Sequence, residues 1–505
     1  MLANEATASL TDSGWETHGD PMDAALLIGA ARLGVGPAEA REAYVMLAEI
    51  PFEPERQYAA SVRHRGGEHV LFVKGAPERV VAMCSAMLDA TGTVALERGR
   101  VLDAARELAD GGLRVLGMAY RVLPGPPVAA EAGQDPHDLV FLGLQGSMDP
   151  PRVGVREAIR SCQEAGIRVV MITGDHAATA RAIAADLGIA PRDARVLTGS
   201  GLAGMDAARV HEAVPRVAVY ARVAPDQKLR VVRALQHHGE VVAVTGDGVN
   251  DAPALRAAQI GVAMGRGGTD VAREAADMVL ADDNFVSIHA AVEEGRVTFD
   301  NLRKATLFLI STGAAEILMI LGALLLEWPL PLLPAQILWL NLVTEGLQDV
   351  AIAFEPGEAG VMKRPPRSPS EGIISRLLWE RTVAAGLVMA VGTLALFRWE
   401  LGATGDLARA QSVALTTMVL FQAFHLGNCR SERRSAFAVS PLSNPFLLLA
   451  AAAALAVHAA ALYVPATQFV LRVVPIEPRA WARIVLVAVT IVAAVEAHKR
   501  LRRRA

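Results

Sequence analysis

Two aspartates in a glycine-rich turn give the strongest chemical signal in the sequence. Asp247 and Asp251 lie in TGDGVNDAP, residues 245–253, directly after the β-branched run VVAVT. Two carboxylates this close repel each other unless a cation lies between or near them, and hard oxygen ligands of this kind suit Mg²⁺. The two glycines let the backbone approach a phosphate or a metal. The structural alternative is an Asp-Gly turn that only caps a helix.

A second acidic turn follows another short apolar run. Thr173, Gly174 and Asp175 form TGD after IRVVMI. The hydroxyl and the amides around the glycine can hold phosphoryl oxygens. Taken alone, Asp175 is better explained as the N-cap of a helix that starts near residue 177. A second TGD turn in the same chain favours phosphate chemistry instead.

Lys228 is one of only five lysines among 49 basic residues. It lies in APDQK, after the run VAVYA. A compact ammonium at this point would neutralise phosphate. The alternative is a solvated lysine on a helix surface.

Ionisable side chains also occur inside apolar stretches, where burial in lipid is costly and function is the default explanation. Glu316 lies in one stretch, and the next holds four oxygen-bearing side chains: Asn341, Thr344, Glu345 and Asp349. Spacings of three and four place these four on one helical face. With Glu316 opposite, they form an oxygen-rich cluster suited to a hard cation. The alternative is a hydrogen-bonded contact between two helices.

The strand-like runs of residues 138–300 predict the secondary-structure elements that position the aspartates. IRVVMI, VAVYA, VVAVT and IGVAM end in polar or glycine-rich segments, with helical stretches such as REAIRSCQEAG between them. This alternation predicts a parallel α/β sheet, in which ligands bind at the carboxyl ends of the strands. In residues 1–137, YAASVRHRGGEHVLFVKG predicts an antiparallel hairpin with RGGE at its turn.

From about residue 305, long apolar stretches alternate with short polar segments. Each is about 20 residues long, the length that crosses the hydrocarbon core of a bilayer. They predict a bundle of six transmembrane helices at about residues 305–326, 334–354, 381–399, 409–428, 442–463 and 480–498. A buried bundle of a soluble protein is the alternative.

Loop basicity predicts the orientation of these helices. Residues 355–380, 429–441 and 499–505 hold 4, 3 and 5 Lys or Arg, whereas the opposite loops hold 0, 0 and 2. By the positive-inside rule, the first set and the region before residue 305 are cytoplasmic. We therefore expect a multi-pass protein of the cell (inner or plasma) membrane with both ends in the cytoplasm.

Composition supports this division. The 505 residues are 52% hydrophobic and 20% charged, which excludes a disordered chain. Residues 1–300 carry 29 basic and 40 acidic side chains, and residues 301–505 carry 20 and 13. No basic stripe runs through the first part, so no nucleic-acid partner is expected. Cys84, Cys162 and Cys429 have no pair spacing, and the first 20 residues lack a signal-peptide pattern.

The motifs together resemble the carboxyl-terminal part of a P-type cation-transporting ATPase, most similar to the branch of calcium pumps and their bacterial relatives. The resemblance covers nearly the whole chain, in the expected order. The motifs are GDPMDAALL, PFEPER, FVKGAPE, GLRVL, DPPR, MITGDH, ARVAPDQK, VTGDGVNDAPAL, NLVTEGLQD and RPPRSP. The resemblance implies three parts: an α+β nucleotide-binding domain at 1–137, a haloacid-dehalogenase-like phosphorylation domain at 138–300 and a transmembrane domain at 301–505.

The resemblance also implies ATP and Mg²⁺ as cofactors and gives the catalytic residues roles. Asp247 is similar to the family's Mg²⁺ ligand, supported by Asn250 and Asp251. Thr173, Gly174 and Lys228 match residues that hold phosphate. Asp175 matches the aspartate of the family's TGD motif.

Five residues match the nucleotide site of the family. Phe52 matches the aromatic that stacks on adenine, Lys74 lines the ATP pocket, and Arg114 reaches the nucleotide. Asp23 takes a position where a glutamate is usual, and Arg222 of ARVAPDQK is placed with this set. Gln57 replaces a usual basic residue.

The ion cluster matches the family in part. Glu316, Asn341 and Glu345 match ion ligands of calcium-type pumps, although Glu345 replaces a usual aspartate. Gly313 stands where an asparagine is usual, and Gln422 where a glutamate is usual. Fewer charged ligands imply one ion per cycle rather than two. Calcium is the first expectation; Mg²⁺, Na⁺, K⁺ and protons stay open.

One motif of the family is absent. Its pumps are phosphorylated on the aspartate of DKTGT, and this sequence contains no Asp-Lys dipeptide. The actuator domain with its TGE loop and the first four spans are absent too, and the phosphorylation domain lacks its first strand. We therefore expect a truncated product, a misplaced start codon, or half of a split pump that requires a separate amino-terminal fragment. The chain alone is expected not to turn over ATP.

Two other functions are compatible with the residues. One is a membrane-anchored, non-catalytic nucleotide-binding or regulatory protein. The other is a haloacid-dehalogenase phosphatase, which is disfavoured because that reaction needs the same absent nucleophile.

Overall fold

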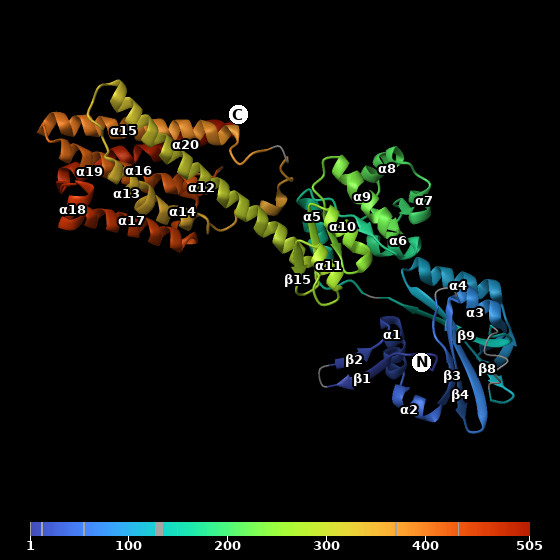
Figure 1. The fold of residues 1–505 in the computed structure, drawn as a ribbon. Coiled ribbons are helices and arrows are strands. Elements are labelled where there is room, and N and C mark those ends of the chain that lie inside the picture. The colour runs from blue at the N-terminus through green and yellow to red at the C-terminus, as the bar shows by residue number, and fades with distance from the viewer. Residues whose placement is uncertain are drawn as a thin grey trace. The chain divides into compact units, whose positions relative to one another are not determined.

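The computed structural model describes residues 2–11, 14–53, 56–126, 135–148, 150–368, 371–432 and 434–504. The chain divides into two compact units, Met1–Arg160 with Arg168–Phe285, and Ser161–Ile167 with Val286–Ala505. Figure 1 shows the elements of both units. Asp149 of the DPPR motif lies outside the described residues. The predicted domain limits near residues 137 and 300 stay predictions.

A seven-stranded sheet occupies much of residues 45–147 (Figure 1). The strand order is β3-β4-β5-β8-β9-β6-β7, and every pair is antiparallel except β6 with β9. The strands are β3 (Val45–Ile50), β4 (Tyr58–Arg65), β5 (Glu68–Gly75), β6 (Cys84–Asp89), β7 (Gly92–Ala95), β8 (Arg114–Leu123) and β9 (Leu139–Ser147).

The predicted hairpin around RGGE is confirmed. β4 and β5 pair antiparallel from Tyr58 with Gly75 to Arg65 with Glu68. Gly66 and Gly67 form the two-residue connection, with φ of 59° and 89°. Only glycine adopts two successive positive φ angles without steric cost, and this backbone matches the twist of the strands it joins.

Two helices, α3 (Pro77–Met83) and α4 (Arg98–Asp110), pack on this sheet. Val80 of α3 and Val101 of α4 are buried in one cluster with Val73 of β5 and Phe141 of β9. This core fixes β5 and β8, the strands that carry Lys74 and Arg114.

A small layer precedes the sheet in sequence: β1 (Thr7–Thr11), β2 (Gly14–His18), α1 (Pro21–Arg32) and α2 (Pro37–Ala43). The two strands pair antiparallel. The Asp20 side chain caps α1 by accepting hydrogen bonds from the amides of Met22 and Asp23. Asp23 therefore lies in the first turn of a capped helix.

The remainder of the first unit alternates strands and helices, as predicted. The predicted parallel pairing is confirmed, but the strands form two separate three-stranded sheets, in the orders β10-β12-β11 and β13-β14-β15. The elements are α5 (Val155–Glu164), β10 (Met171–Ile172), α6 (Ala177–Asp186), β11 (Val196–Thr198), α7 (Gly199–Ala203), α8 (Ala207–Ala213), η2 (Val214–Arg216), β12 (Val219–Ala221), α9 (Pro225–His237), β13 (Ala243–Gly246), η3 (Val249–Asp251), α10 (Ala252–Ala257), β14 (Ile260–Met264), α11 (Asp270–Ala275) and β15 (Met278–Leu280). Among the described residues, β10 and β13 each pair along one edge only.

The second unit is helical. Its elements are α12 (Phe285–Leu325), α13 (Pro334–Trp339), η4 (Leu340–Glu345), α14 (Gly346–Ile352), η5 (Val361–Lys363), α15 (Arg376–Thr404), α16 (Leu407–Cys429), η6 (Ala436–Ala438), η7 (Pro441–Ser443), α17 (Pro445–Tyr463), α18 (Pro465–Leu471), α19 (Pro478–Ala488) and α20 (Thr490–Arg504). Helix α16 contacts α15, α17, α19 and α20 and so lies at the centre of this bundle (Figure 1).

Four helices in the described part of the chain are long and apolar enough to cross a membrane: Phe285–Leu325, Arg376–Thr404, Pro445–Tyr463 and Pro478–Arg502. The predicted count of six is therefore not confirmed. The predicted span 334–354 is broken by η4, a π-helical segment between α13 and α14. The predicted span 409–428 corresponds to α16, which carries many buried polar side chains, such as Gln411, Thr416 and Gln422.

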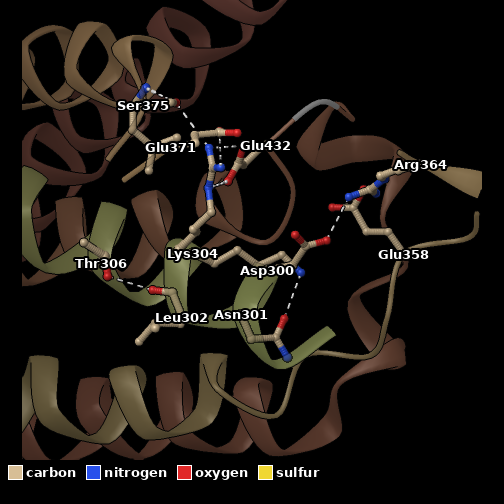
Figure 2. A network of polar contacts seen from close by, with 12 residues as sticks. Asp300, Asn301, Leu302, Lys304, Thr306, Glu358, Arg364, Glu371, Ser375 and Glu432 are labelled. Atoms are coloured by element: carbon tan, nitrogen blue, oxygen red, sulfur yellow. Dashed lines mark hydrogen bonds and ion pairs between the residues drawn. The ribbon is translucent and has the colours of Figure 1, made fainter. Parts of the chain in front are cut away.

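Helix α12 has 41 residues and is therefore about 60 Å long, twice the thickness of a hydrocarbon core. Its part before residue 305 carries polar contacts to the segment between α14 and α15, as Figure 2 shows. Arg364 donates to Asp300 at 2.8 Å, and Arg303 donates to Glu371 at 3.1 Å. Arg303 also lies 2.8 Å from Glu432. These ion pairs tie the polar half of α12 to two connecting segments of the bundle.

Candidate functional site

The turn after β13 brings the two predicted aspartates together in different roles. Oδ2 of Asp251 accepts hydrogen bonds from the amides of Asp247 at 3.3 Å and Gly248 at 3.2 Å. Its Oδ1 accepts from the ammonium of Lys228, in the first turn of α9, at 2.6 Å. The Asp247 side chain is exposed, and no hydrogen bond to its carboxylate is found among the described residues. Asp251 therefore shapes the turn, and Asp247 presents an uncommitted carboxylate.

Gly246 is required for this turn. A Cβ at this position would lie 2.5 Å from Cβ of Asp251, closer than any carbon contact allows. At Gly248 the nearest atom to an added Cβ is 3.7 Å away, an ordinary contact. The first glycine of TGDG thus allows the aspartate to fold back under the strand end.

A further aspartate, which sequence reasoning missed, holds the neighbouring loop. Asp283 is 6% exposed and accepts from the amides of Gly265, Arg266 and Gly267 at 2.6, 3.1 and 2.7 Å. These amides, that of Gly267 first, lower the pKa of the Asp283 carboxyl below its ordinary value. The same loop continues to Thr269, whose amide donates to the carbonyl of Asp247 at 2.8 Å. The aspartate pair of LADDNF, directly after an apolar run, was the available signal.

The TGD turn after β10 is closed on itself. The Thr173 hydroxyl donates to Asp175 at 3.1 Å and accepts from the Asp175 amide at 3.1 Å. The helix that follows is capped by His176 rather than by Asp175. Gly174 is exposed, with no atom within 4 Å of an added Cβ, so its backbone is accessible to a ligand.

Two predicted nucleotide-site residues contact this TGD turn instead. The guanidinium of Arg114 donates to Asp175 at 3.0 Å. The Arg222 amide donates to the carbonyl of Asp175 at 3.1 Å, from a residue with φ of 51°. A non-glycine residue in this left-handed region is strained and is held there by its surroundings. The Arg222 side chain is exposed.

The oxygen donors around Asp247 show whether the predicted magnesium site fits the metal. Within the described part of the chain, no group of three His, Cys, Asp or Glu residues could hold a metal ion. Mg²⁺ is usually bound by one or two carboxylates, with water and substrate phosphate as the other ligands. The free carboxylate of Asp247, with Asp251 in the same turn and exposed Asn250 beside it, fits that mode. Lys228, whose side chain is 20% exposed, adds a positive charge at the edge of the turn.

Two other residues predicted to contact the nucleotide, Lys74 and Asp23, pair with each other. Lys74 of β5 is 7% exposed and forms an ion pair with Asp23 of α1. A Cβ at Gly75 would lie 2.4 Å from the carbonyl of Gln57, so the glycine of KGAPE lets the end of β5 approach the residue that precedes β4. Phe52, in the segment after β3, is 57% exposed and leaves a ring face accessible for stacking.

Arg114 lies at some distance from Lys74 on the same sheet. Lys74 pairs with Met118 of β8, four residues from Arg114, which corresponds to about 13 Å along the strand. Residues separated by four along a strand share a face. The structure therefore places both basic residues on one face, but it brings only Arg114 to the TGD turn.

The helical unit contains the second predicted site. Asn341 of η4 donates to Glu316 of α12 at 3.3 Å. With its amide reversed, Asn341 donates to both Glu316 at 3.0 Å and Glu345 at 3.1 Å. Glu345 also accepts from the hydroxyl of Thr312 on α12. Glu316 and Glu345 are 7% and 4% exposed, so two buried carboxyl groups are joined through one amide.

Thr344 contacts a third helix. Its hydroxyl donates to the Leu340 carbonyl at 2.8 Å and to Gln422 of α16 at 2.9 Å. Thr344 and Gln422 are fully buried. The π-helical segment η4 has a wider turn than an α-helix, and such segments often occur at functional sites. Here it directs Thr344 towards α16 and Glu345 towards α12.

The remaining predicted residue of this unit, Asp349, lies apart from the cluster. Asp349 is on α14, and its Oδ1 is buried with no hydrogen-bond partner among the described residues. His458 contacts Trp339 and Thr416, and His425 lies 3.4 Å from the Cys429 sulfur. Thr312 was missed because a threonine can bond its own helix, as it also does here to Phe308.

Comparisons with known proteins agree along the whole chain. Residues 1–154 match the family "P-type ATPase, cytoplasmic domain N", and residues 329–501 match "Cation transporting ATPase, C-terminus". Residues 86–259 and 229–291 match haloacid dehalogenase-like hydrolases. The chain belongs to the P-type cation-transporting ATPase family. P-type ATPases generally use ATP and Mg²⁺.

Curated relatives carry matching names. The chain is 44% identical over 501 residues to the "Probable cation-transporting ATPase F" of Mycobacterium tuberculosis, covering 98% of this chain and 55% of that protein. It is 40% identical to the "Calcium-transporting ATPase" of Bacillus subtilis, covering 96% and 55%. It is 39% identical to the "Cation-transporting ATPase pma1" of Synechocystis, covering 95% and 54%. The chain spans about half the length of the curated relatives it matches.

Proposed function

We propose that this chain is the nucleotide-binding, magnesium-binding and ion-binding part of an ATP-driven cation pump. The observation that carries the proposal is the turn after β13, where Lys228 holds Asp251 and leaves the carboxylate of Asp247 free. In a P-type ATPase, this arrangement would hold Mg²⁺ and the transferred phosphoryl group at the carboxyl end of a parallel strand. Thr173 and Gly174 at the end of β10 would contact the phosphoryl oxygens, with Asp175 closing that turn.

The nucleotide would lie on the seven-stranded sheet. Exposed Phe52 provides a face for adenine, and Lys74 lines the pocket with its charge balanced by Asp23. Arg114 and Arg222 lie against the TGD turn, so we assign them to the phosphate end of the nucleotide rather than to adenine.

We further propose that the buried cluster of Glu316, Asn341, Thr344 and Glu345 binds the transported cation. Two carboxyl groups, an amide and hydroxyls provide the hard oxygen ligands that Ca²⁺ takes. Calcium is the first assignment because several relatives are named calcium-transporting ATPases. Asp349 makes no hydrogen bond to this cluster among the described residues and is assigned a peripheral place.

The phosphate acceptor is proposed to come from a segment outside these 505 residues, in the same longer protein or in a separate chain. The sequence has no Asp-Lys dipeptide. β10 and β13, whose ends carry the two TGD motifs, each have an edge without a partner strand in the described residues. Both pack into one core, through Ile172 and Val244. A further parallel strand could pair with these edges and bring its terminal carboxylate to Asp247.

The test is formation of an acid-stable phosphoenzyme from radiolabelled ATP. The 505-residue chain alone is expected to give none, whereas the chain joined to or co-expressed with a segment carrying DKTGT gives a Mg²⁺-dependent product. Asp247→Asn should abolish that product. The matched control is Asp270→Asn, whose side chain is 88% exposed. Labelling of the chain alone would contradict the missing acceptor, and ATP binding without any labelling would favour a non-catalytic nucleotide-binding protein.

The ion site is tested in the same extended protein. Glu345→Gln should raise the Ca²⁺ concentration for half-maximal phosphorylation by about tenfold or more, because a buried ligand loses its charge. The control is Glu327→Gln, an exposed residue between α12 and α13. An equal shift for Ba²⁺, Mg²⁺ and Ca²⁺ would argue against a calcium site.

We also propose that both ends of the helical unit face the cytoplasm, from the basic loops identified in the sequence. A cysteine placed at Ala505 should react with an impermeant maleimide only in inside-out vesicles. A cysteine at Arg472, in a loop on the opposite side, should react only in right-side-out vesicles. The reverse pattern would contradict the orientation.

A further inference from the structure

A pocket of about 510 Å³ lies between the start of α15 and the end of α20. It is lined by Arg376, Leu377, Glu380, Arg381, Glu432, Lys499 and Arg502. Four of these side chains are cationic and two are carboxylates. The pocket shares no residue with the ion cluster.

The two carboxylates are already paired. Glu432 lies 2.8 Å from Arg303, in the network of Figure 2. Glu380 forms ion pairs with Arg376 at 3.3 Å and with Arg502. His498 also lies 3.7 Å from Glu380. These pairs leave the pocket with an excess of positive charge.

Within this positive charge, Arg381 is the side chain that indicates a ligand. It is 4% exposed, and its Nε and Nη1 atoms have no hydrogen-bond partner among the described residues. A buried guanidinium with unused donors is costly, whereas phosphate oxygens satisfy such donors well. The neighbouring Lys499 is 2% exposed and donates to the carbonyls of Asn428 and Arg434. Lys499 also lies 3.9 Å from Glu496, so its charge is partly balanced and Arg381 supplies the unpaired positive charge of the pocket wall.

An apolar surface adjoins this pocket. A second pocket of about 750 Å³ shares Glu380 and Arg502 with the first and adds His498 and three apolar side chains, Trp379, Val383 and Leu501. The three apolar side chains are 54%, 52% and 70% exposed. They lie at the ends of two candidate spans, Arg376–Thr404 and Pro478–Arg502. Tryptophan is enriched where a span meets the lipid headgroups.

We propose that this double pocket binds one anionic phospholipid, with its phosphodiester at Arg381 and Arg376 and its acyl chains against Trp379, Val383 and Leu501. A free phosphate would use the first pocket alone and would leave the three apolar side chains uncovered. A pocket rich in basic side chains that adjoins exposed apolar side chains at the end of two spans fits a molecule that is anionic at one end and apolar at the other. The proposal depends on membrane insertion but not on ATP or cation binding, so it can fail independently of the proposed function.

The test is native mass spectrometry of the 505-residue chain in neutral detergent micelles. Phosphatidylglycerol and phosphatidylcholine with identical acyl chains are added together, and the ratio of the two adducts is measured. The wild-type chain should retain phosphatidylglycerol about fivefold or more over phosphatidylcholine, the preference that about one desolvated basic contact provides. Arg381→Gln should bring the ratio close to one, and Arg381→Lys should retain part of it. The control is Arg398→Gln, an exposed arginine at the opposite end of α15.

Each outcome decides the proposal. If Arg381→Gln aggregates, the double variant Arg376→Gln/Arg502→Gln replaces it, because both side chains are exposed at the rim and should tolerate substitution. A ratio near one in the wild-type chain, or an unchanged ratio in both pocket variants, would overturn the proposal. Retention of phosphatidylglycerol in 20 mM inorganic phosphate supports a lipid site. Its displacement by inorganic phosphate would overturn the lipid in favour of a free anion.

Discussion

The ammonium of Lys228 lies 2.6 Å from Oδ1 of Asp251, while Oδ2 of the same carboxylate accepts the amides of Asp247 and Gly248. One side chain of the aspartate pair is thus used to build the turn, and the other is left free. Asp251 therefore has a structural role and Asp247 is available for a ligand, although the sequence motif does not distinguish the two aspartates.

The first prediction contrasts the two aspartates. Asp251→Asn should raise hydrogen exchange of the Asp247 and Gly248 amides about tenfold, because the turn loses its charge-assisted acceptor. Asp247→Asn should leave that exchange unchanged, since its exposed side chain accepts no hydrogen bond in the described structure. Exchange followed by mass spectrometry of the intact chain in micelles measures both. Equal exchange in the two variants would show that Asp251 does not hold the turn.

A second prediction concerns the two glycines of this turn. Gly246→Ala should destabilise it by about 1–3 kcal/mol, the usual cost of overpacking, because the new Cβ meets Asp251 at 2.5 Å. Gly248→Ala serves as the control and should change stability by less than about 0.5 kcal/mol, since its nearest contact is 3.7 Å. Denaturant titration of exchange at residues 243–251 compares them. A larger effect at Gly248 would contradict the geometry.

The third prediction is a pH dependence at Asp283. Its folded-state pKa lies below its ordinary value because it accepts amides of Gly267, Arg266 and Gly265. A depressed folded pKa contributes stability above the unfolded pKa of about 3.9, and that contribution is lost as the pH falls through the folded pKa. Protection of amides 265–267, corrected for intrinsic exchange, should therefore be constant from pH 7 to pH 5 and decline below about pH 4.

A matched pair of variants isolates this effect. Asp283→Asn should expose amides 265–267 already at pH 7 and remove the decline below pH 4. Asp193→Asn, an exposed aspartate between α6 and β11 with no hydrogen bond to residues 265–267 in the described part of the chain, should behave as wild type. Unchanged protection in Asp283→Asn would mean that the loop is held by other contacts.

The fourth prediction concerns a buried ion pair in the helical unit. Arg430 donates to Oε1 of Glu355 at 2.9 and 2.7 Å, and Asn444 donates to Oε2 at 3.0 Å. The side chains of Arg430 and Glu355 are 7% and 4% exposed. Glu355→Ala should cost about 3–5 kcal/mol, because it leaves a buried guanidinium without its partner. Thermal unfolding of the intact chain in micelles ranks the stabilities of the variants.

Two comparisons test that explanation. The double variant Glu355→Leu/Arg430→Met should recover most of the loss, since no unpaired charge remains. Glu97→Ala, which breaks an exposed pair with Arg100, should have almost no effect. A double variant as unstable as Glu355→Ala would show that packing, and not the unpaired charge, is responsible.

The sequence by itself determined the local features. Alternating apolar runs and glycine punctuation are properties of neighbouring residues, so the β4–β5 hairpin and the parallel pairing of β10 with β12 and of β13 with β14 followed directly from them. The sequence motifs were likewise sufficient to indicate the family. Hydrophobic length alone was less reliable, because η4 breaks one predicted span and buried polar residues fill α16.

Only the tertiary structure decided which side chains share a contact. Spacing could not show that Lys228 pairs with Asp251, that Arg114 reaches Asp175, or that Asp283 holds a loop 16 to 18 residues away. It also could not show that Arg381 is buried with unused donors. Hydrogen bonds and ion pairs act over about 3 Å between atoms, whereas sequence patterns constrain only the path of the backbone, and many packings satisfy one pattern.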